Sequence, residues 1–266
     1  MTRIETAPAD TPNDRVTAAV LIIGDEILSG RTQDTNLRDI AKYLGVHGVD
    51  LAEARTVPDV HEEIIAALNA LRARYDYVLT TGGIGPTHDD ITADAVAAAF
   101  GVELYEHPEI IEQIEARIRS RPGVEMNAAM RRMARVPVGG ALVRSSVAAP
   151  PGFTIGNVFV LAGVPTIMRG MLEDVGHRLR GGAVTVSRTV RVEGSGESVI
   201  AAPLEAVARA HPAMSLGSYP FFDGGVYGSN LVLRGRDPGE LAATIVELFA
   251  ALKSAGIETV REIDAP

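Results

Sequence analysis

Two adjacent carboxylates, Asp89 and Asp90, stand at the end of a glycine-rich loop that could bind a phosphorylated ligand. Glycine permits positive φ and close backbone approach, so the N–H groups of this loop could hold phosphate oxygens. Because carboxylates repel phosphate, we interpret Asp89 and Asp90 as ligands of a divalent metal, or as acceptors for an amino-pterin or a ribose. The other loop residues that we expect at the ligand are Thr81, Gly82, Gly83, Gly85, Pro86 and Thr87.

A second loop with glycines, Gly24 to Gly30, carries Asp25 and Glu26. Each loop follows an apolar run, so both should lie at the carboxyl edge of a parallel sheet, where ligands bind. Asp59 would add a further acceptor at this edge. The alternative is structural: Asp25 and Glu26 interact with a helix dipole, Asp59 caps the helix that follows it, and the Asp89–Asp90 pair caps the next helix.

The apolar patterns predict the elements that position these loops. Strands are expected at 16–23, 49–57, 76–81 and 158–161, and residues 37–44, 64–71 and 91–100 have helical spacing. The order βαβαβα indicates an α/β fold with a doubly wound, mostly parallel sheet. After Arg180-Gly181-Gly182, the order βαββαβ predicts a small α+β domain. We expect a disordered tail over 1–15, the α/β domain over 16–180 and the α+β domain over 183–266.

The amino-acid composition limits the kinds of binding partner that we expect. The 266 residues contain 46% apolar side chains, no cysteine and a net charge of −9. Neither half of the chain is basic, so we expect no nucleic-acid partner. No apolar run approaches the length of a membrane span, and residues 1–15 lack the apolar middle of a signal peptide, so we predict a soluble cytoplasmic protein. The small second domain would have a thin core alone, which predicts a homo-oligomer, in particular a dimer.

The loops, taken together, resemble the amino-terminal part of the CinA family, a branch of the molybdopterin-binding fold of the MoaB and MogA type. The resemblance covers about residues 16–180, and it is most specific in the glycine-rich loop. The matching motifs are Gly24-Asp25-Glu26-Ile27-Leu28-Ser29-Gly30, Asp34-Thr35-Asn36, Thr56-Val57-Pro58-Asp59, Thr80-Thr81-Gly82-Gly83-Ile84-Gly85-Pro86-Thr87-His88-Asp89-Asp90 and Gly163-Val164-Pro165.

The resemblance implies a hydrolase of a nucleotide pyrophosphate such as ADP-ribose or FAD, assisted by magnesium, manganese or cobalt and by potassium. It also places Asn36 and Pro165 at the ligand. Two alternatives remain open: a non-catalytic molybdopterin-binding protein of molybdenum-cofactor biosynthesis, and adenylylation of molybdopterin. The chain departs from the family pattern at Ala162, where the family has proline, and at Ile167, where it has glutamate.

Overall fold

The computed structural model describes residues 15–121 and 123–263. The chain divides into two compact units, with the division between Gly182 and Ala183. We call them the first and the second unit and describe each by itself. The tail predicted for residues 1–15 lies outside the described residues, except for Arg15, whose side chain donates to Asp50. No helix in the described part of the chain is long and apolar enough to span a membrane.

A six-stranded sheet in the order β2-β1-β3-β8-β7-β6 forms the centre of the first unit. The pairs β1–β2, β1–β3 and β3–β8 are parallel, whereas β7 and β6 run antiparallel at one edge. The predicted doubly wound, mostly parallel sheet is therefore confirmed, and two edge strands are added to it. The strands are β1 (Val16–Ile23), β2 (Val49–Val57), β3 (Tyr77–Thr81), β6 (Ala141–Val143), β7 (Gly152–Ile155) and β8 (Val158–Leu161).

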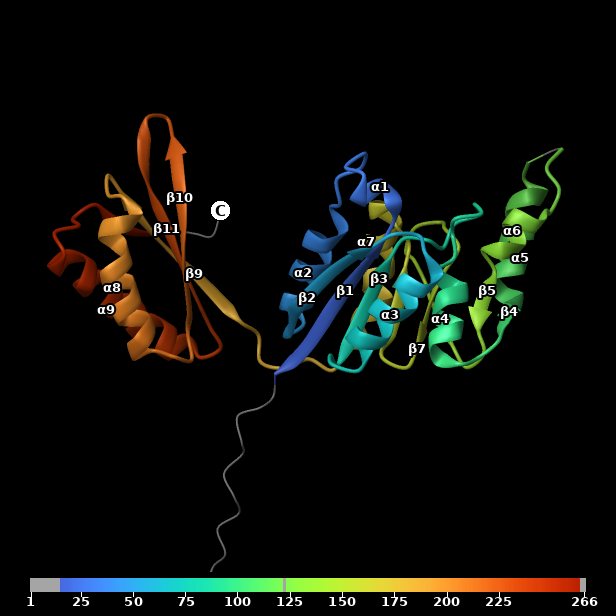
Figure 1. Cartoon of the computed structure of the whole chain (residues 1–266), viewed down its shortest axis with the longest axis horizontal. Coiled ribbons are helices and arrows are strands. Elements are labelled where there is room, and N and C mark those ends of the chain that lie inside the picture. The colour runs from blue at the N-terminus through green and yellow to red at the C-terminus, as the bar shows by residue number, and fades with distance from the viewer. Residues whose placement is uncertain (1–14, 122, 264–266) are drawn as a thin grey trace, which may run out of the picture. The chain divides into compact units, whose positions relative to one another are not determined.

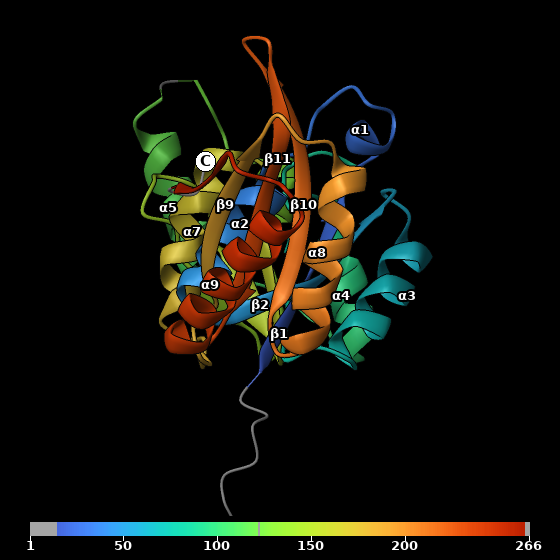
Figure 2. The same cartoon turned by 90° about the vertical axis from the view of Figure 1, so that its left-hand side faces the viewer.

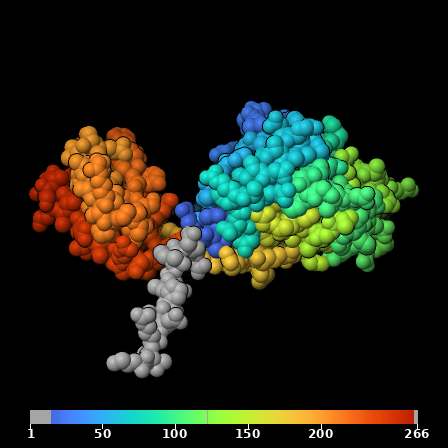
Figure 3. All heavy atoms as spheres, turned by 60° about the horizontal axis from the view of Figure 1, so that its bottom comes forward, coloured from blue at the N-terminus to red at the C-terminus, as the bar shows by residue number. Residues whose placement is uncertain are grey.

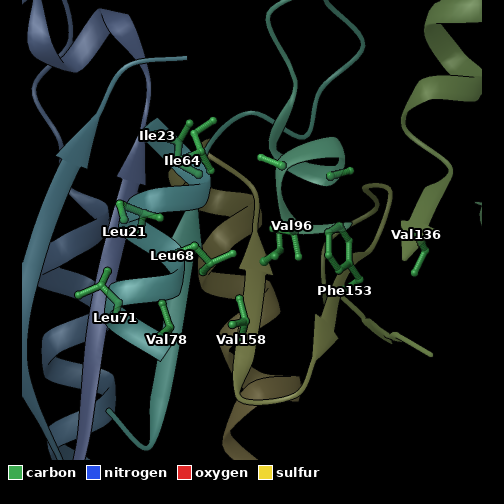
Figure 4. Packing of buried hydrophobic residues seen from close by; sticks show 14 of the residues in the cluster. Leu21, Ile23, Ile64, Leu68, Leu71, Val78, Val96, Val136, Phe153 and Val158 are labelled. Atoms are coloured by element: carbon green, nitrogen blue, oxygen red, sulfur yellow. The ribbon is translucent and has the colours of Figure 1, made fainter. Parts of the chain in front are cut away.

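Helices cover both faces of this sheet because alternate residues of β1 point to opposite sides. Leu21 and Ile23 of β1 pack with Ile64 and Leu68 of α3, together with residues of α4 and α5 (Figure 4). The intervening residue Ile22 belongs to a second cluster, which includes α2 and α7. The helices are α1 (Asp25–Leu28), α2 (Asn36–Val46), α3 (His61–Arg72), α4 (Thr92–Phe100), α5 (Pro108–Arg119), α6 (Ala128–Arg132) and α7 (Pro165–Gly176).

A two-stranded ribbon lies beside the main sheet. It pairs β4 (Leu104–Glu106) with β5 (Arg135–Pro137) in antiparallel fashion. The ribbon, α5 and α6 lie together at one end of the first unit, coloured green in the space-filling view (Figures 1 and 3). Because α6 immediately precedes β5, the ribbon fixes the position of the short α6.

Side-chain hydrogen bonds link the elements at the amino edge of the parallel strands, opposite the edge that carries the predicted site. The side-chain amide of Asn157, just before β8, donates to the carbonyl oxygens of Arg72 and Tyr75 at 3.0 and 2.9 Å. The backbone N–H and the hydroxyl of Thr17 donate to the carboxylate of Asp76 at 2.8 and 3.0 Å. These bonds join α3, β1, β3 and β8 at one edge.

The second unit is an α+β fold with the predicted order of elements. Its four strands form an antiparallel sheet in the order β10-β11-β9-β12, with α8 and α9 on the same face (Figures 1 and 2). Val190, Leu231, Leu233, Ile200 and Leu248 are fully buried between them. The elements are β9 (Val186–Glu193), α8 (Glu197–Ala210), β10 (Ser215–Asp223), β11 (Val226–Gly235), α9 (Pro238–Ser254) and β12 (Val260–Ile263).

Candidate functional site

The two predicted loops lie side by side at the carboxyl edge of the sheet. Strands β1 and β3 are parallel neighbours, and Ile22 pairs with Thr81 in the last register position. The chain therefore leaves both strands at the same level, and it enters α1 after β1 and the glycine-rich loop after β3. Figure 1 shows α1 at this edge. The topology thus brings together residues that are separated by more than fifty positions in sequence.

Asp59 joins the first loop to the end of β2. Its Oδ2 accepts the backbone N–H of Asp25 at 3.0 Å, and the N–H of Gly24 donates to the carbonyl oxygen of Val57 at 3.1 Å. The interpretation of Asp59 as a helix cap is wrong: α3 has Val60 at its N-cap position and no side-chain cap. The carboxylate instead holds the first turn of α1 from across the site.

Glycine is required at two positions of the loop after β3. Gly82 has φ +99° and Gly83 has φ +67°. A Cβ atom would overlap the carbonyl oxygen of Ile23 at the first position and the hydroxyl of Thr92 at the second. The loop therefore packs directly on the end of β1 and on the start of α4, with no room for a side chain.

Three consecutive backbone N–H groups in this loop are open, which means that they donate no hydrogen bond to any described residue. The N–H of Gly82 donates to the carbonyl oxygen of Leu161. Those of Gly83, Ile84 and Gly85 have no hydrogen-bond acceptor among the residues that the structure describes. Successive N–H groups of this kind, close to the start of a helix, form a concavity that favours an anion.

The carboxylate of Asp90 folds back onto its own loop. Its Oδ2 accepts the backbone N–H of Thr87 at 2.7 Å and also the Thr87 hydroxyl. Helix α4 has Ile91 at its N-cap position and no side-chain cap, so the interpretation of Asp89 or Asp90 as its cap is wrong. Asp89 is exposed, and one oxygen of Asp90 is not used by Thr87.

The carboxylates of the three loops are close enough to influence one another. Burial raises the pKa of Asp59, and the negative charges of Asp25, Glu26 and Asp89 raise it further, against the lowering effect of the Asp25 N–H. Within residues 15–121 and 123–263, no three His, Cys, Asp or Glu side chains are arranged to hold a metal ion. The metal predicted at Asp89 and Asp90 stays a prediction.

A pocket of about 70 Å³ lies between the first loop and the start of α7. We call it the Asn36 pocket. Asn36 is 5% exposed, and its Nδ2 donates to the carbonyl oxygen of Gly163 at 2.8 Å, whereas its Oδ1 is buried without a hydrogen-bond partner among the described residues. The lining combines apolar side chains with acceptor groups. It consists of Ile22, Ile23, Glu26, Ile27, Thr32, Gln33, Asp34, Thr35, Asn36, Thr81, Gly82, Gly163 and Pro165.

A narrower crevice of about 10 Å³ opens on the other side of the glycine-rich loop. We call it the Arg132 crevice. Sequence reasoning missed most of its residues because they come from α5, α6, β5 and β7, which carry no recognisable motif. Its lining consists of Gly83, Ile84, Gly85, Asp90, Ala93, Ile110, Arg132, Met133, Arg135, Val136, Pro151 and Phe153.

The structure therefore brings most of the predicted residues to one edge. Glu26, Asn36, Thr81, Gly82 and Pro165 line the Asn36 pocket, and Gly83, Gly85 and Asp90 line the Arg132 crevice. Gly24, Asp25, Asp59, Pro86, Thr87 and Asp89 line neither. The two departures also line neither: Ala162 is buried, and Ile167 packs partly against the core.

Comparisons with known proteins identify the family of this chain. The family model described as "Probable molybdopterin binding domain" matches residues 19–181, and "FAD synthase, middle domain" matches residues 185–261. The first match covers more than half of the chain, so the chain belongs to the molybdopterin-binding domain family. Within that family it is CinA-like, as its motifs predicted.

The similarity to individual relatives extends over different shares of the chain. A CinA-like protein of Gemmatimonas aurantiaca is 35% identical over 216 residues, which are 77% of this chain and 50% of the relative. The chain thus spans about half the length of that relative. A protein of Pyrococcus furiosus is 32% identical over 252 residues, 91% of this chain and 97% of the relative. The crystal structure of CinA from Thermoplasma acidophilum, of unknown function, gives a TM-score of 0.57 at 28% identity and covers 62% of this chain and 99% of that one.

Proposed function

We propose that this chain binds a nucleotide pyrophosphate of the ADP-ribose or FAD type at the carboxyl edge of its first unit and hydrolyses it. The observation that carries the proposal is the run of open N–H groups at Gly83, Ile84 and Gly85. These donors line the Arg132 crevice, and the adjacent Gly82 lines the Asn36 pocket, so a phosphate bound to the N–H groups would lie next to a ring or a ribose in that pocket. The match of residues 185–261 to the FAD synthase middle domain supports a nucleotide ligand.

Different groups of the chain bind different parts of the ligand. The N–H groups of the glycine-rich loop donate hydrogen bonds to the phosphate oxygens and stabilise negative charge that develops during hydrolysis. The Asn36 pocket presents acceptors to the N–H and O–H groups of a ring or a ribose. Asp25, Glu26 and Asp59 add acceptors at the rim of the same edge.

The donor set suits a hard divalent cation. Asp89 is exposed, and Thr87 uses only one oxygen of Asp90, so the pair offers carboxylate oxygens beside the phosphate position. Magnesium typically uses one or two carboxylates and completes its shell with substrate phosphates and water. Asp89 and Asp90 would hold such a cation, which would supply Lewis-acid polarisation of a phosphoryl oxygen and of water. Potassium at this site remains an expectation from the family resemblance.

A second candidate is a non-catalytic molybdopterin-binding protein. The bonds from Thr87 to Asp90 favour it, because they give Asp90 a structural role that needs no metal. The family description names the same ligand. Molybdopterin presents a phosphate and an amino-substituted ring, so it would use the same N–H groups and the same pocket.

Turnover and binding assays separate the candidates. The full chain is incubated with ADP-ribose, FAD or molybdopterin plus ATP, each with magnesium, manganese or cobalt and with or without potassium. Release of AMP from ADP-ribose or FAD supports the hydrolase. Binding of molybdopterin without turnover of any substrate would replace it with the binding protein, and formation of adenylylated molybdopterin would replace it with the adenylyl transferase.

A further inference from the structure

An unpaired arginine stands beside the open N–H groups of the glycine-rich loop. Arg132 is the last residue of α6 and is partly buried. It lines the same crevice as Gly83 and Gly85. Among the described residues it forms no ion pair, although Asp90 lines the crevice too. A partly buried cation without a counter-charge is costly, and an anionic ligand would remove that cost.

The second arginine of the crevice is already neutralised. Both terminal nitrogens of Arg135 donate to the carboxylate of Asp94, at 2.8 and 2.7 Å. This bidentate pair holds β5 against α4. Of the two arginines that line the crevice, Arg132 is therefore the one whose charge is available to a ligand. The neighbouring Arg131 points its charge elsewhere, because it pairs with Glu106 at 2.7 Å.

The size of the crevice restricts what can enter it. Its volume of about 10 Å³ suits a single atom of the size of a water oxygen and excludes a sugar or a ring. A phosphoryl oxygen fits this description. The site otherwise carries negative charge from Asp25, Glu26, Asp59 and Asp89, so a phosphate there needs a cation from the protein as well as any metal.

We propose that Arg132 is a phosphate-binding residue: its guanidinium contacts a phosphoryl oxygen of the ligand that lies on the N–H groups of Gly83, Ile84 and Gly85. The proposal rests on the phosphorylated ligand of the proposed function. Arg132 acts on the phosphate part and leaves recognition of the ring to the Asn36 pocket. It would therefore serve nucleotide and pterin ligands alike.

The test compares Arg132→Gln with Arg131→Gln, a matched control one residue away whose charge pairs with Glu106. Calorimetry with inorganic pyrophosphate and with ADP-ribose gives Kd, and ADP-ribose hydrolysis gives KM and kcat. We expect Arg132→Gln to weaken binding of both compounds by about 10- to 100-fold, the range for loss of a charge-assisted hydrogen bond. Arg131→Gln should change Kd by less than about 2-fold.

Arg132→Lys guards against a folding defect, since it keeps the charge and should recover part of the affinity. Normal binding by Arg132→Gln, or equal loss in Arg131→Gln, would overturn the proposal while leaving the hydrolase intact. Pyrophosphate binding that depends on Arg132, without turnover of any nucleotide, supports the proposal and removes the hydrolase. A wild-type chain that binds neither compound with any metal overturns both.

Discussion

The hydroxyl of Thr92 donates a 3.0 Å hydrogen bond to the carbonyl oxygen of Gly82, and the N–H of Thr92 donates to the carbonyl oxygen of Gly83, also at 3.0 Å. Thr92 is fully buried at the first position of α4. With both carbonyl groups turned toward α4, the loop leaves its next three N–H groups for a ligand. Thr92 therefore shapes the site without lining either hollow.

Replacing Thr92 with valine should weaken both the fold and the site. Valine keeps the volume but leaves the Gly82 carbonyl without its donor, at a cost of about 1–2 kcal/mol in the free energy of unfolding. The matched control is Thr244→Val, because Thr244 is equally buried and its hydroxyl donates within its own helix, to the carbonyl oxygen of Glu240. Urea unfolding and the Kd for pyrophosphate measure the two effects. Unchanged pyrophosphate binding in Thr92→Val would show that the hydroxyl does not shape the loop.

Replacing Gly82 with alanine should destabilise the first unit by about 3 kcal/mol or more. The left-handed conformation alone costs about 1–2 kcal/mol, and the overlap with the Ile23 backbone adds to it. Gly101 has φ +66° but nothing within 4 Å of a Cβ, so Gly101→Ala isolates the first cost. Thermal melting of both variants gives the comparison. Equal losses would mean that the contact with β1 is unimportant.

Replacing Asp89 or Asp90 with asparagine should separate catalysis from stability. Neither residue caps α4, and asparagine keeps an oxygen for Thr87, so the free energy of unfolding should change by about 1 kcal/mol or less. Turnover of ADP-ribose should fall by about 100-fold, since each ~1.4 kcal/mol added to the barrier is a factor of ten. Melting and hydrolysis are measured over a range of metal concentrations. Full activity in both variants would remove the pair from the mechanism.

Asp59 should reduce stability at neutral pH. Burial and the neighbouring carboxylates raise its pKa in the folded chain, so ionisation costs stability as pH rises through that pKa. Asp59→Asn keeps an acceptor for the Asp25 N–H and removes the charge. We expect its Tm to exceed that of the wild type by about 2 °C at pH 7, and the difference to vanish near pH 3.

Asp76→Asn is the control of opposite sign. The backbone N–H of Thr17 is the main cause of the lowered pKa of Asp76, so its charge stabilises the fold above the ordinary carboxyl range. This stability is lost as pH falls through the lowered pKa. Asp76→Asn should therefore melt below the wild type at pH 7 and approach it in acid. A Tm difference of the same sign for both variants would contradict this account.

The sequence pattern predicted the parallel sheet and the common edge of the two loops for one physical reason. A strand buried on both faces, such as Val16–Ile23, needs an unbroken apolar run, and the turn that ends it needs glycine. Both signals are local and strong. The common edge of the two loops then follows from the rules of parallel topology, which hold without any knowledge of side-chain contacts.

The features that were missed depend on contacts between distant residues. Asp59 has the spacing of a capping residue, but its carboxylate instead accepts a hydrogen bond from the N–H of Asp25, 34 positions away. The strands β6 and β7 have only three and four residues, too few for a clear period. Arg132 lies in a short helix without a motif, and only the packing of the ribbon brings it to the glycine-rich loop.

The hydrogen bonds made by Asn157 and by Asp76 lie at the amino edge of the sheet, away from the loops of the candidate site. The hydrogen bonds that stabilise the fold and the groups of the candidate site therefore lie at opposite ends of the same strands. Residues at the carboxyl edge that line a hollow, such as Asn36 and Arg132, can be substituted without disturbing these hydrogen bonds. Laboratory evolution confined to that edge should therefore yield variants with new ligands that still fold, which makes the first unit a suitable scaffold for redesign.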